Sequence, residues 1–136
     1  MKRIAIIADN SIDFISRLLT AWNNNESVVL IDYRTPCVAC LEMIIRSEVS
    51  EVYTDRNDLV DYINQLENTK LCVNLIRSEG GVKEVTDESR RLFIKRHDDE
   101  EAIILFSSGT TGNCKGIRLS HAAIIKNAEE YQKERE

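Results

Sequence analysis

Short apolar runs alternate with amphipathic helical patterns along this chain, and that alternation restricts its possible folds more than any other feature. Each run is continuously apolar, which is typical of strands buried on both faces. Strands that alternate with helices form a parallel sheet with right-handed crossovers. The predicted class is therefore α/β, a mostly parallel sheet with helices on both faces. The predicted strands are Ile4–Ala8, Val28–Tyr33, Val49–Thr54, Leu71–Ile76 and Ala102–Phe106.

Apolar residues recur at helical spacing between the first four strands, which predicts three helices. The first carries a stripe that ends at Trp22, the second a stripe from Val38 to Ile45, and the third spans Asp58–Leu66. Each stripe is narrow enough to face the sheet while the opposite side meets water.

Capping residues mark the starts of these helices. Asp9, Asn10 and Ser11 offer side-chain oxygens that can cap the first helix. Thr35 and Pro36 are predicted as the cap and the first helical residue of the second.

A strongly charged segment, Arg77–Glu101, interrupts this rhythm. Because long unstructured loops are unusual in compact domains, we predict a hairpin that turns at Gly80–Gly81 and a short strand at Leu92–Lys95. Further along, Ser120 is a good cap for a final helix. Residues 1–136 are predicted to form a single α/β domain, with 77–101 as a charged, irregular insertion.

The bulk composition excludes several classes of protein. With 136 residues, of which 43% are hydrophobic and 30% charged, the chain suits one globular domain. Its net charge of -5 argues against a broad nucleic-acid-binding surface. No stretch approaches the ~18 apolar residues of a membrane helix, and the apolar part of the N-terminus is too short for a signal peptide. A cytoplasmic location is expected, with neither nucleic acid nor membrane as a partner.

The cysteines raise the question of redox or metal chemistry. Cys37 and Cys40 form a C-V-A-C motif at a predicted helix start, where a thiolate can be stabilised. A zinc site needs about four ligands, and the sequence holds no second C-x-x-C and no H-x-x-x-H. We therefore predict no metal site, and a CxxC redox protein ranks last among the functional hypotheses.

A glycine-rich stretch, "SSGTTGNCKG" at Ser107–Gly116, is the strongest candidate for a functional site. Glycines let an anion approach backbone N–H groups, the hydroxyls add donors, and Lys115 adds a mobile charge that suits phosphate. The predicted order is strand, loop and helix, so a helix that begins near Ser120 would add its positive dipole end. The spacing matches neither a Walker A loop nor GxGxxG. A flexible linker is the alternative to a phosphate-binding loop.

The longer stretch "ILFSSGTTGNCKGIRLSH", Ile104–His121, closely resembles the signature loop of the adenylate-forming enzymes. That superfamily includes acyl-CoA synthetases, the adenylation domains of peptide synthetases, and luciferases. Its pattern is roughly [YF]-[TS]-S-G-T-T-G-x-P-K-G-x-x-x-[ST]-H, and the single departure is Cys114 in place of the usual proline. Upstream, "VVLIDYRTPCVACLEMIIRSEVSEVYTD" is similar to the family more loosely. The resemblance thus covers most of the chain.

The resemblance implies an ATP-dependent ligase that activates carboxylic acids. Such enzymes use ATP and Mg²⁺ to form an acyl-adenylate and pyrophosphate, and commonly pass the acyl group to CoA or a carrier-protein thiol. Lys115 is implied to stabilise the charge of the departing pyrophosphate, with Gly116 completing the turn. His121 also matches the pattern and is expected to pack or bond locally. The residues implied to hold the β/γ-phosphates are Ser107, Ser108, Gly109, Thr110, Thr111, Gly112, Lys115 and Gly116.

The resemblance also implies parts that this sequence lacks. Residues that bind Mg²⁺ and the acyl group, and a C-terminal domain with a catalytic lysine, are expected outside this chain. We interpret the chain as the N-terminal part of an AMP-binding domain and expect it to be inactive alone. A non-catalytic nucleotide- or phosphate-binding module, or a pseudoenzyme, is the alternative. Apolar patches on such a piece predict self-association.

Overall fold

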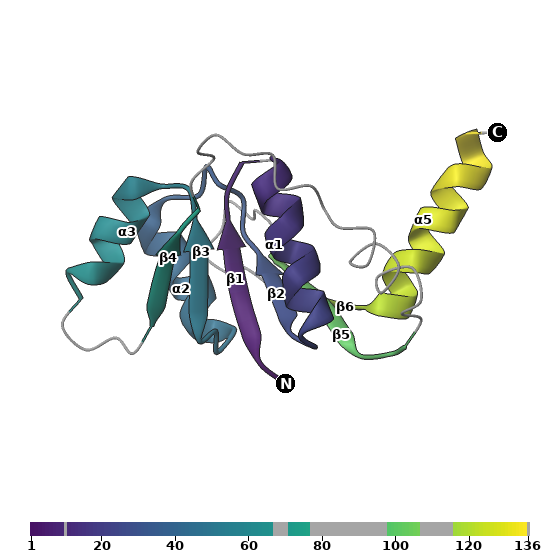
Figure 1. The fold of residues 1–136 in the computed structure, drawn as a ribbon, viewed down its shortest axis with the longest axis horizontal. Helices are drawn as coiled ribbons and strands as arrows, with labels where there is room; N and C mark the ends of the chain where they lie inside the picture. Colours follow the sequence, from purple (N-terminus) through teal and green to yellow (C-terminus); the bar gives the residue numbers. More distant parts are fainter. Residues whose placement is uncertain (10, 67–70, 77–97, 107–115, 136) are drawn as a thin grey trace.

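The computed structural model describes residues 1–9, 11–66, 71–76, 98–106 and 116–135. They form a six-stranded sheet flanked by helices, in the strand order β4-β3-β1-β2-β5-β6 (Figure 1). The strands are β1 (Arg3–Ile7), β2 (Ser27–Leu30), β3 (Glu51–Thr54), β4 (Cys72–Leu75), β5 (Glu101–Phe106) and β6 (Gly116–Ser120). The helices are α1 (Ile12–Asn23), α2 (Cys37–Arg46), α3 (Asn57–Asn64) and α5 (His121–Arg135).

The strand pairings confirm the predicted class. β4, β3, β1, β2 and β5 run parallel to one another, and β6 alone pairs antiparallel, with β5. Each of the five predicted strands and three predicted helices of the N-terminal part is present, displaced at its ends by a few residues at most.

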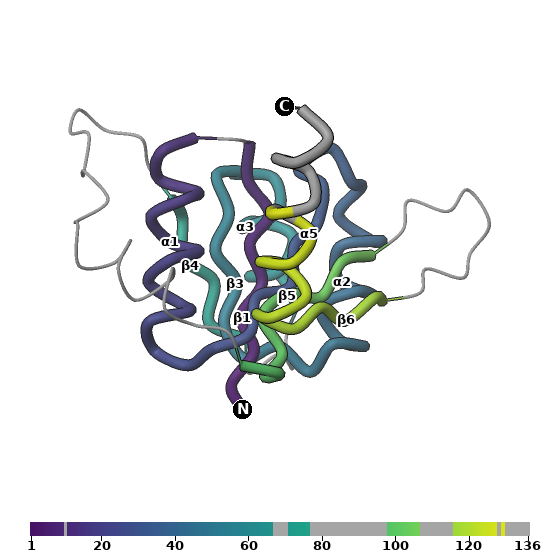
Figure 2. The backbone as a smooth tube through the Cα atoms, turned by 90° about the vertical axis from the view of Figure 1, so that its right-hand side faces the viewer, coloured from purple at the N-terminus to yellow at the C-terminus, as the bar shows by residue number. Residues whose placement is uncertain are grey.

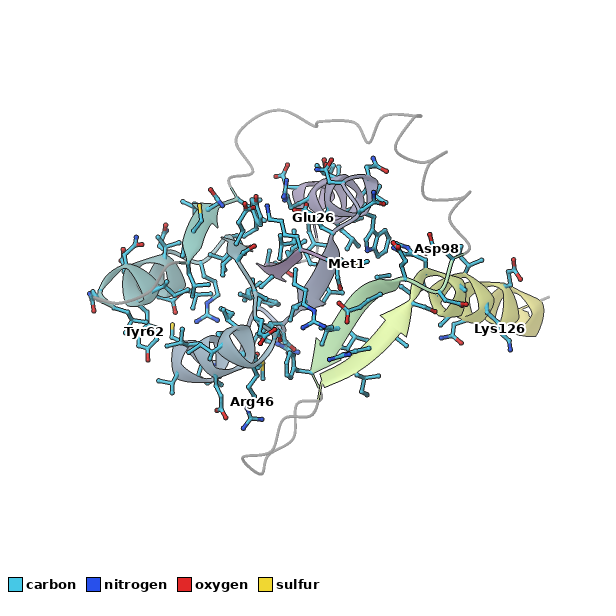
Figure 3. The ribbon with its side chains drawn as sticks, turned by 90° about the horizontal axis from the view of Figure 1, so that it is seen from below. Met1, Glu26, Arg46, Tyr62, Asp98 and Lys126 are labelled. Carbon is cyan, nitrogen blue, oxygen red and sulfur yellow. The ribbon has the colours of Figure 1, made fainter. Side chains whose placement is uncertain are left out.

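Both faces of the sheet are covered, as the continuous apolar runs predicted. Ile4 and Ile6 pack on the α1 side with Trp22, whereas Ala5 and Ile7 pack on the side of α2 and α3. Successive residues of a strand point to opposite faces, so a strand buried on both sides needs apolar residues throughout. Figure 3 shows α1 on one side of the sheet and α2 and α3 on the other. No helix in the described part of the chain is long and apolar enough to cross a membrane.

The structure corrects the predicted order after β5. Gly116–Ser120 form a sixth strand, β6, and α5 begins only after it. The side chains of β6 are exposed or only half-buried, so its sequence lacks the continuous apolar run that revealed the other strands. The predicted cap is confirmed, because the Ala123 N–H donates to Ser120 Oγ at 3.1 Å.

The predicted start of α1 is confirmed and that of α2 is shifted. Ser11 caps α1, accepting a hydrogen bond from the Phe14 N–H at 3.1 Å. Thr35 does not cap α2: Pro36 occupies the cap position with ψ of 147°, and no side chain accepts a capping bond there. Because that ψ is extended, helical geometry begins one residue later, at Cys37.

The predicted hairpin at Gly80–Gly81 and strand at Leu92–Lys95 lie outside the described residues. At the end of that insertion, Glu101 already belongs to β5. Its carboxylate accepts two hydrogen bonds from Arg3, at 2.9 and 3.0 Å, and Arg3 also donates to the Ser47 carbonyl at 3.1 Å. This ion pair therefore joins β1, β5 and the end of α2.

We expect Glu101→Gln to destabilise the fold by about 1.5–3 kcal/mol at neutral pH, the range for hydrogen bonds to charged groups. Burial alone would raise the pKa of Glu101, but the hydrogen bonds from Arg3 and the attraction of Arg3 and Arg118 outweigh it and hold that pKa below its ordinary value. A depressed pKa contributes stability above the unfolded pKa, and that stability is lost as pH falls through the folded value.

Urea denaturation at pH 7 and near pH 3 tests this. The difference in the free energy of unfolding between wild type and Glu101→Gln should become smaller at the lower pH, because Glu101 is then protonated in the wild type. Glu42→Gln is the control: its ion pair with Arg46 is exposed on α2, so it should change stability by at most about 0.5 kcal/mol. A gap for Glu101→Gln that persists unchanged at low pH would contradict the ionic assignment.

Glu48 follows α2 with a positive φ of 55°, in the left-handed region that favours glycine. We expect Glu48→Gly to stabilise the chain by about 0.5–1 kcal/mol, since relief of strain exceeds the added entropy of the unfolded state. Glu48→Ala removes the same charge but keeps the Cβ atom, so it should give no gain. Equal denaturation midpoints for the two variants would count against backbone strain.

Candidate functional site

The glycine-rich segment is attached where the parallel strands end. β5 ends at Phe106, β6 begins at Gly116, and these two residues are paired in the antiparallel ladder. Figure 2 shows β5 and β6 side by side at the edge of the sheet. Because β5 runs parallel to β2 and β1, both ends of the segment lie at the carboxyl edge of those strands. Ligands of open α/β sheets bind outside this edge.

Most of the predicted phosphate ligands lie outside the described residues, and so does Cys114; their contacts stay predictions. Those ligands are Ser107, Ser108, Gly109, Thr110, Thr111, Gly112 and Lys115. The structure gives the positions of Phe106 and Gly116, the residues at the two ends of the segment.

Gly116 is described, and close packing explains why it is a glycine. A Cβ atom there would lie 3.1 Å from Ile104 Cγ2 and 3.4 Å from two ring atoms of Phe106. Gly116 is the first residue of β6, and its expected part in the preceding turn stays a prediction because residues 107–115 lie outside the described residues. Its lack of a side chain lets the aromatic ring of Phe106 lie across the end of the hairpin.

The structure contradicts the expected helix dipole at the loop. α5 begins at His121, at the far end of β6 from Gly116. Its first N–H groups are already used: His121 donates to the Glu100 carbonyl at 3.1 Å and Ala122 to the Asp98 carbonyl at 2.9 Å. A strand of five residues therefore separates the segment from the positive end of this helix.

A cavity of about 370 Å³ opens over the carboxyl ends of β1, β2 and β5, and Phe106, the last residue before the segment, is part of its lining. It combines aromatic rings, carboxylates and one guanidinium. Arg34 forms an ion pair with Asp32 at 3.0 Å, and the side-chain hydrogen bond from Arg34 holds the pKa of Asp32 below its usual value. The lining residues are Ala8, Asp9, Phe14, Leu30, Ile31, Asp32, Tyr33, Arg34, Leu105 and Phe106.

Arg56 is a residue that sequence reasoning missed. Its guanidinium donates to the carbonyls of Tyr33, at 3.0 Å, and Thr35, so it fixes the turn that contributes Tyr33 to the cavity. It also forms an ion pair with Asp58 at 2.7 Å. No local spacing predicts such a contact, because the partners lie more than twenty residues away on another loop.

The cysteine motif lies at the start of α2, and its thiols are free. Burial raises the pKa of Cys40 to about 11, and burial together with the hydrogen bond to Asp58 raises the pKa of Cys37. Redox enzymes with a cysteine at such a position lower its pKa. The expectation of a stabilised thiolate is therefore not met. Within the described residues, no group of three His, Cys, Asp or Glu side chains is placed to hold a metal ion.

His121 lies away from the segment, as its predicted local role requires. Its side chain is 1% exposed, and its ring meets that of Trp22 edge to face, with centroids 5.4 Å apart. Trp22 in turn donates to the Ala102 carbonyl at 2.9 Å. His121 thus packs α5 against α1 and β5.

The profile of the family described as "AMP-binding enzyme" matches residues 1–136. This chain belongs to that family.

Curated relatives are acyl-CoA ligases and hybrid synthetases. The chain is 30% identical over 128 residues to 4-coumarate–CoA ligase-like 2 of Arabidopsis thaliana, covering 93% of this chain and 18% of that protein. It is 26% identical over 121 residues to the PKS-NRPS hybrid synthetase acdB of Aspergillus candidus, covering 89% of this chain and 5% of that protein. The chain thus spans less than a fifth of the length of these relatives.

Solved structures show the same fold. A fatty acyl CoA synthetase of Mycobacterium tuberculosis matches with a TM-score of 0.72 at 15% identity, over 97% of this chain and 26% of that one. The N-terminal domain of FACL13 from the same organism matches with a TM-score of 0.65 at 20% identity, over 88% and 31%. The predicted fold, part of the N-terminal region of adenylate-forming enzymes, is confirmed.

We expect Gly116→Ala to destabilise the chain by about 1–3 kcal/mol, the usual cost of an added methyl group in a tightly packed site. Ile117→Thr, at the next and largely exposed position of β6, is the control and should stay within about 0.5 kcal/mol of wild type. Chemical denaturation measures both. A Gly116→Ala variant as stable as the control would show that Ile104 and Phe106 move aside at no cost.

Proposed function

We propose that this chain supplies the ATP-phosphate-binding part of an AMP-forming ligase that activates carboxylic acids. The observation that carries the proposal is the place of the glycine-rich segment. In a chain matched throughout by the AMP-binding family, both ends of that segment are held by the Phe106–Gly116 pair at the carboxyl edge of the sheet.

In the proposed reaction, a carboxylate oxygen attacks the α-phosphorus of ATP and pyrophosphate leaves. Backbone N–H groups of the segment, with the hydroxyls of Ser107, Ser108, Thr110 and Thr111, bind the β/γ-phosphates, and Lys115 stabilises the charge that develops on pyrophosphate. Donors that are fixed beforehand act in this way without a reorganisation cost. The acyl-adenylate is then proposed to transfer its acyl group to a thiol of CoA or of a carrier protein.

Mg²⁺ is proposed to be held by residues outside this chain. It would neutralise phosphate charge when bound. The described residues hold no cluster suited to a metal ion, so each role proposed for this chain concerns its own hydroxyl, backbone and lysine donors.

A non-catalytic phosphate-binding module is the second candidate, because the residues assigned a role in this chain are all phosphate ligands. Hydrogen bonds to a charged group contribute about 1.5–3 kcal/mol each. After ordering costs, a few of them leave about 4 kcal/mol, which corresponds to a millimolar dissociation constant. The chain alone is therefore proposed to bind ATP weakly and to catalyse little.

An NMR titration of the chain with ATP and with pyrophosphate tests the binding site. Resonances of residues 107–116 should shift first, at millimolar ligand. Lys115→Ala should weaken binding about tenfold or more, the equivalent of one lost charge-assisted hydrogen bond. Lys126→Ala, on exposed α5, removes the same charge elsewhere and should leave the affinity unchanged. Equal affinities for the two variants would refute the role of Lys115.

ATP–pyrophosphate exchange with a panel of carboxylic acids separates the two candidates. Exchange in a protein that carries this chain, abolished by Lys115→Ala, supports the ligase. Phosphate binding without exchange for any acid supports the binding module.

A further inference from the structure

Two thiols and one guanidinium form a cluster at the start of α2 that the proposed function does not use. Arg56 Nη2 lies 3.4 Å from Cys37 Sγ, and Arg56 Nη1 lies 3.9 Å from Cys40 Sγ. Both sulfur atoms therefore face the same planar group. Cys37 is partly exposed and Cys40 is fully buried behind it.

We propose that Cys37 and Cys40 form a dithiol modification site, which closes to an intramolecular disulfide by exchange with a low-molecular-weight disulfide such as oxidised glutathione. The site is distinct from the phosphate-binding segment and does not rest on the proposed ligase function.

The backbone allows this closure. Residues three apart on a helix are neighbours on its surface, with Cβ atoms about 5–6 Å apart, and a disulfide needs about 3.5–4.5 Å. Cys37 is the first residue of α2, where N–H groups lack intrahelical partners. The first turn can therefore tighten without breaking the hydrogen bonds of the rest of the helix.

The exchange balances in two steps. The partly exposed Cys37 loses its proton and attacks one sulfur of glutathione disulfide, which forms a mixed disulfide and releases one glutathione thiolate. The Cys40 thiolate then attacks Cys37 Sγ and releases the second. Two electrons pass from the protein thiols to the glutathione disulfide, and the two protons end on the two glutathione thiols.

Two charged groups, Asp58 and Arg56, lie beside Cys37 and shift the pKa of its thiol in opposite directions. Its thiol donates to Asp58 Oδ2 at 3.5 Å, and Arg56 forms an ion pair with the same carboxylate. Burial and Asp58 raise the pKa of Cys37, while Arg56 lowers it, and Cys40 is the third titratable group beside it. At neutral pH the thiols are therefore protonated, so the exchange is slow and speeds up as pH rises.

Formation of the Cys37–Cys40 disulfide affects the cavity through Arg56. The same guanidinium holds the Tyr33 and Thr35 carbonyls, and Tyr33 lines the cavity. When the sulfur atoms bond to each other, Arg56 loses two thiol acceptors. The modification thus changes the contacts of the residue that fixes this turn.

The test uses the 136-residue chain with Cys72→Ser and Cys114→Ser, so that only the proposed pair can react. The folded chain is incubated with oxidised glutathione and its intact mass is followed. The expected product has lost two hydrogen atoms and carries no glutathione, with a Cys37–Cys40 cross-link in the peptide map. A stable glutathione adduct at Cys37, or no reaction of the folded chain, would overturn the proposal.

Single variants fix the order of attack. In the same background, Cys40→Ser should stop at the mixed disulfide on Cys37, and Cys37→Ser should leave the buried Cys40 unmodified. A mixed disulfide that forms on Cys40 instead would contradict Cys37 as the attacking thiol.

Asp58→Asn supplies a readout that simple exposure of the thiols would not give. It removes the carboxylate that accepts the Cys37 proton, so the pKa of Cys37 should fall. At a pH below that pKa, each unit of decrease raises the thiolate fraction about tenfold but makes the thiolate about threefold less nucleophilic, so exchange should speed up about threefold. Asp61→Asn, exposed on the same helix, is the matched control and should leave the rate unchanged. Equal rates for the two variants would refute the geometry assigned to Cys37.

Discussion

Burial of the parallel strands on both faces is the constraint on which the rest of this structure depends. Helix α1 covers one face of the sheet, and α2 and α3 cover the other (Figures 1 and 3). The parts of the sheet that stay open are therefore the ends of the strands. Parallel strands send all their carboxyl ends to one edge. Asp9, Asp32 and Phe106, far apart in sequence, consequently border one cavity. Phe106 and Gly116, the two ends of the glycine-rich segment, lie at this same edge.

The antiparallel pairing of β6 with β5 determines how the glycine-rich segment is attached at that edge. Pairing of β5 with β6 holds the two ends of the glycine-rich segment together, so the segment does not act as a linker between separate elements. The same pairing carries the start of α5 to the opposite end of the hairpin, where its N–H groups bond to Asp98 and Glu100. The positive end of α5 is therefore directed away from Phe106 and Gly116, where the glycine-rich segment is attached.

Arg56 illustrates how one partly buried cation joins the β2–α2 turn to the starts of α2 and α3. It reaches two carbonyls of the β2–α2 turn, two thiols and one carboxylate. A cation surrounded by acceptors is stable when partly buried, whereas loss of the acceptors would leave it uncompensated. The chemical state of Cys37 and Cys40 is thereby connected to the turn that lines the cavity.

Local signals account for the parts that could be predicted from the sequence. The apolar runs gave the strands because burial on both faces needs apolar residues at every position, and Ser11 and Ser120 marked helix starts because capping is a local interaction. The motif from Ile104 to His121 pointed to the family, which the profile match then showed.

Tertiary structure alone decided the rest. β6 has a mostly exposed surface, so only its pairing with β5 reveals it. Gly116 packs closely against two residues across the hairpin, and Arg56 finds partners on another loop. The sequence by itself determined the class of fold, the caps of α1 and α5 and the family motif, because these depend on residues close together along the chain. The position of the two ends of the glycine-rich segment, the lining of the cavity at the strand ends and the environment of the thiols depend on contacts between distant residues, which only the folded chain brings together.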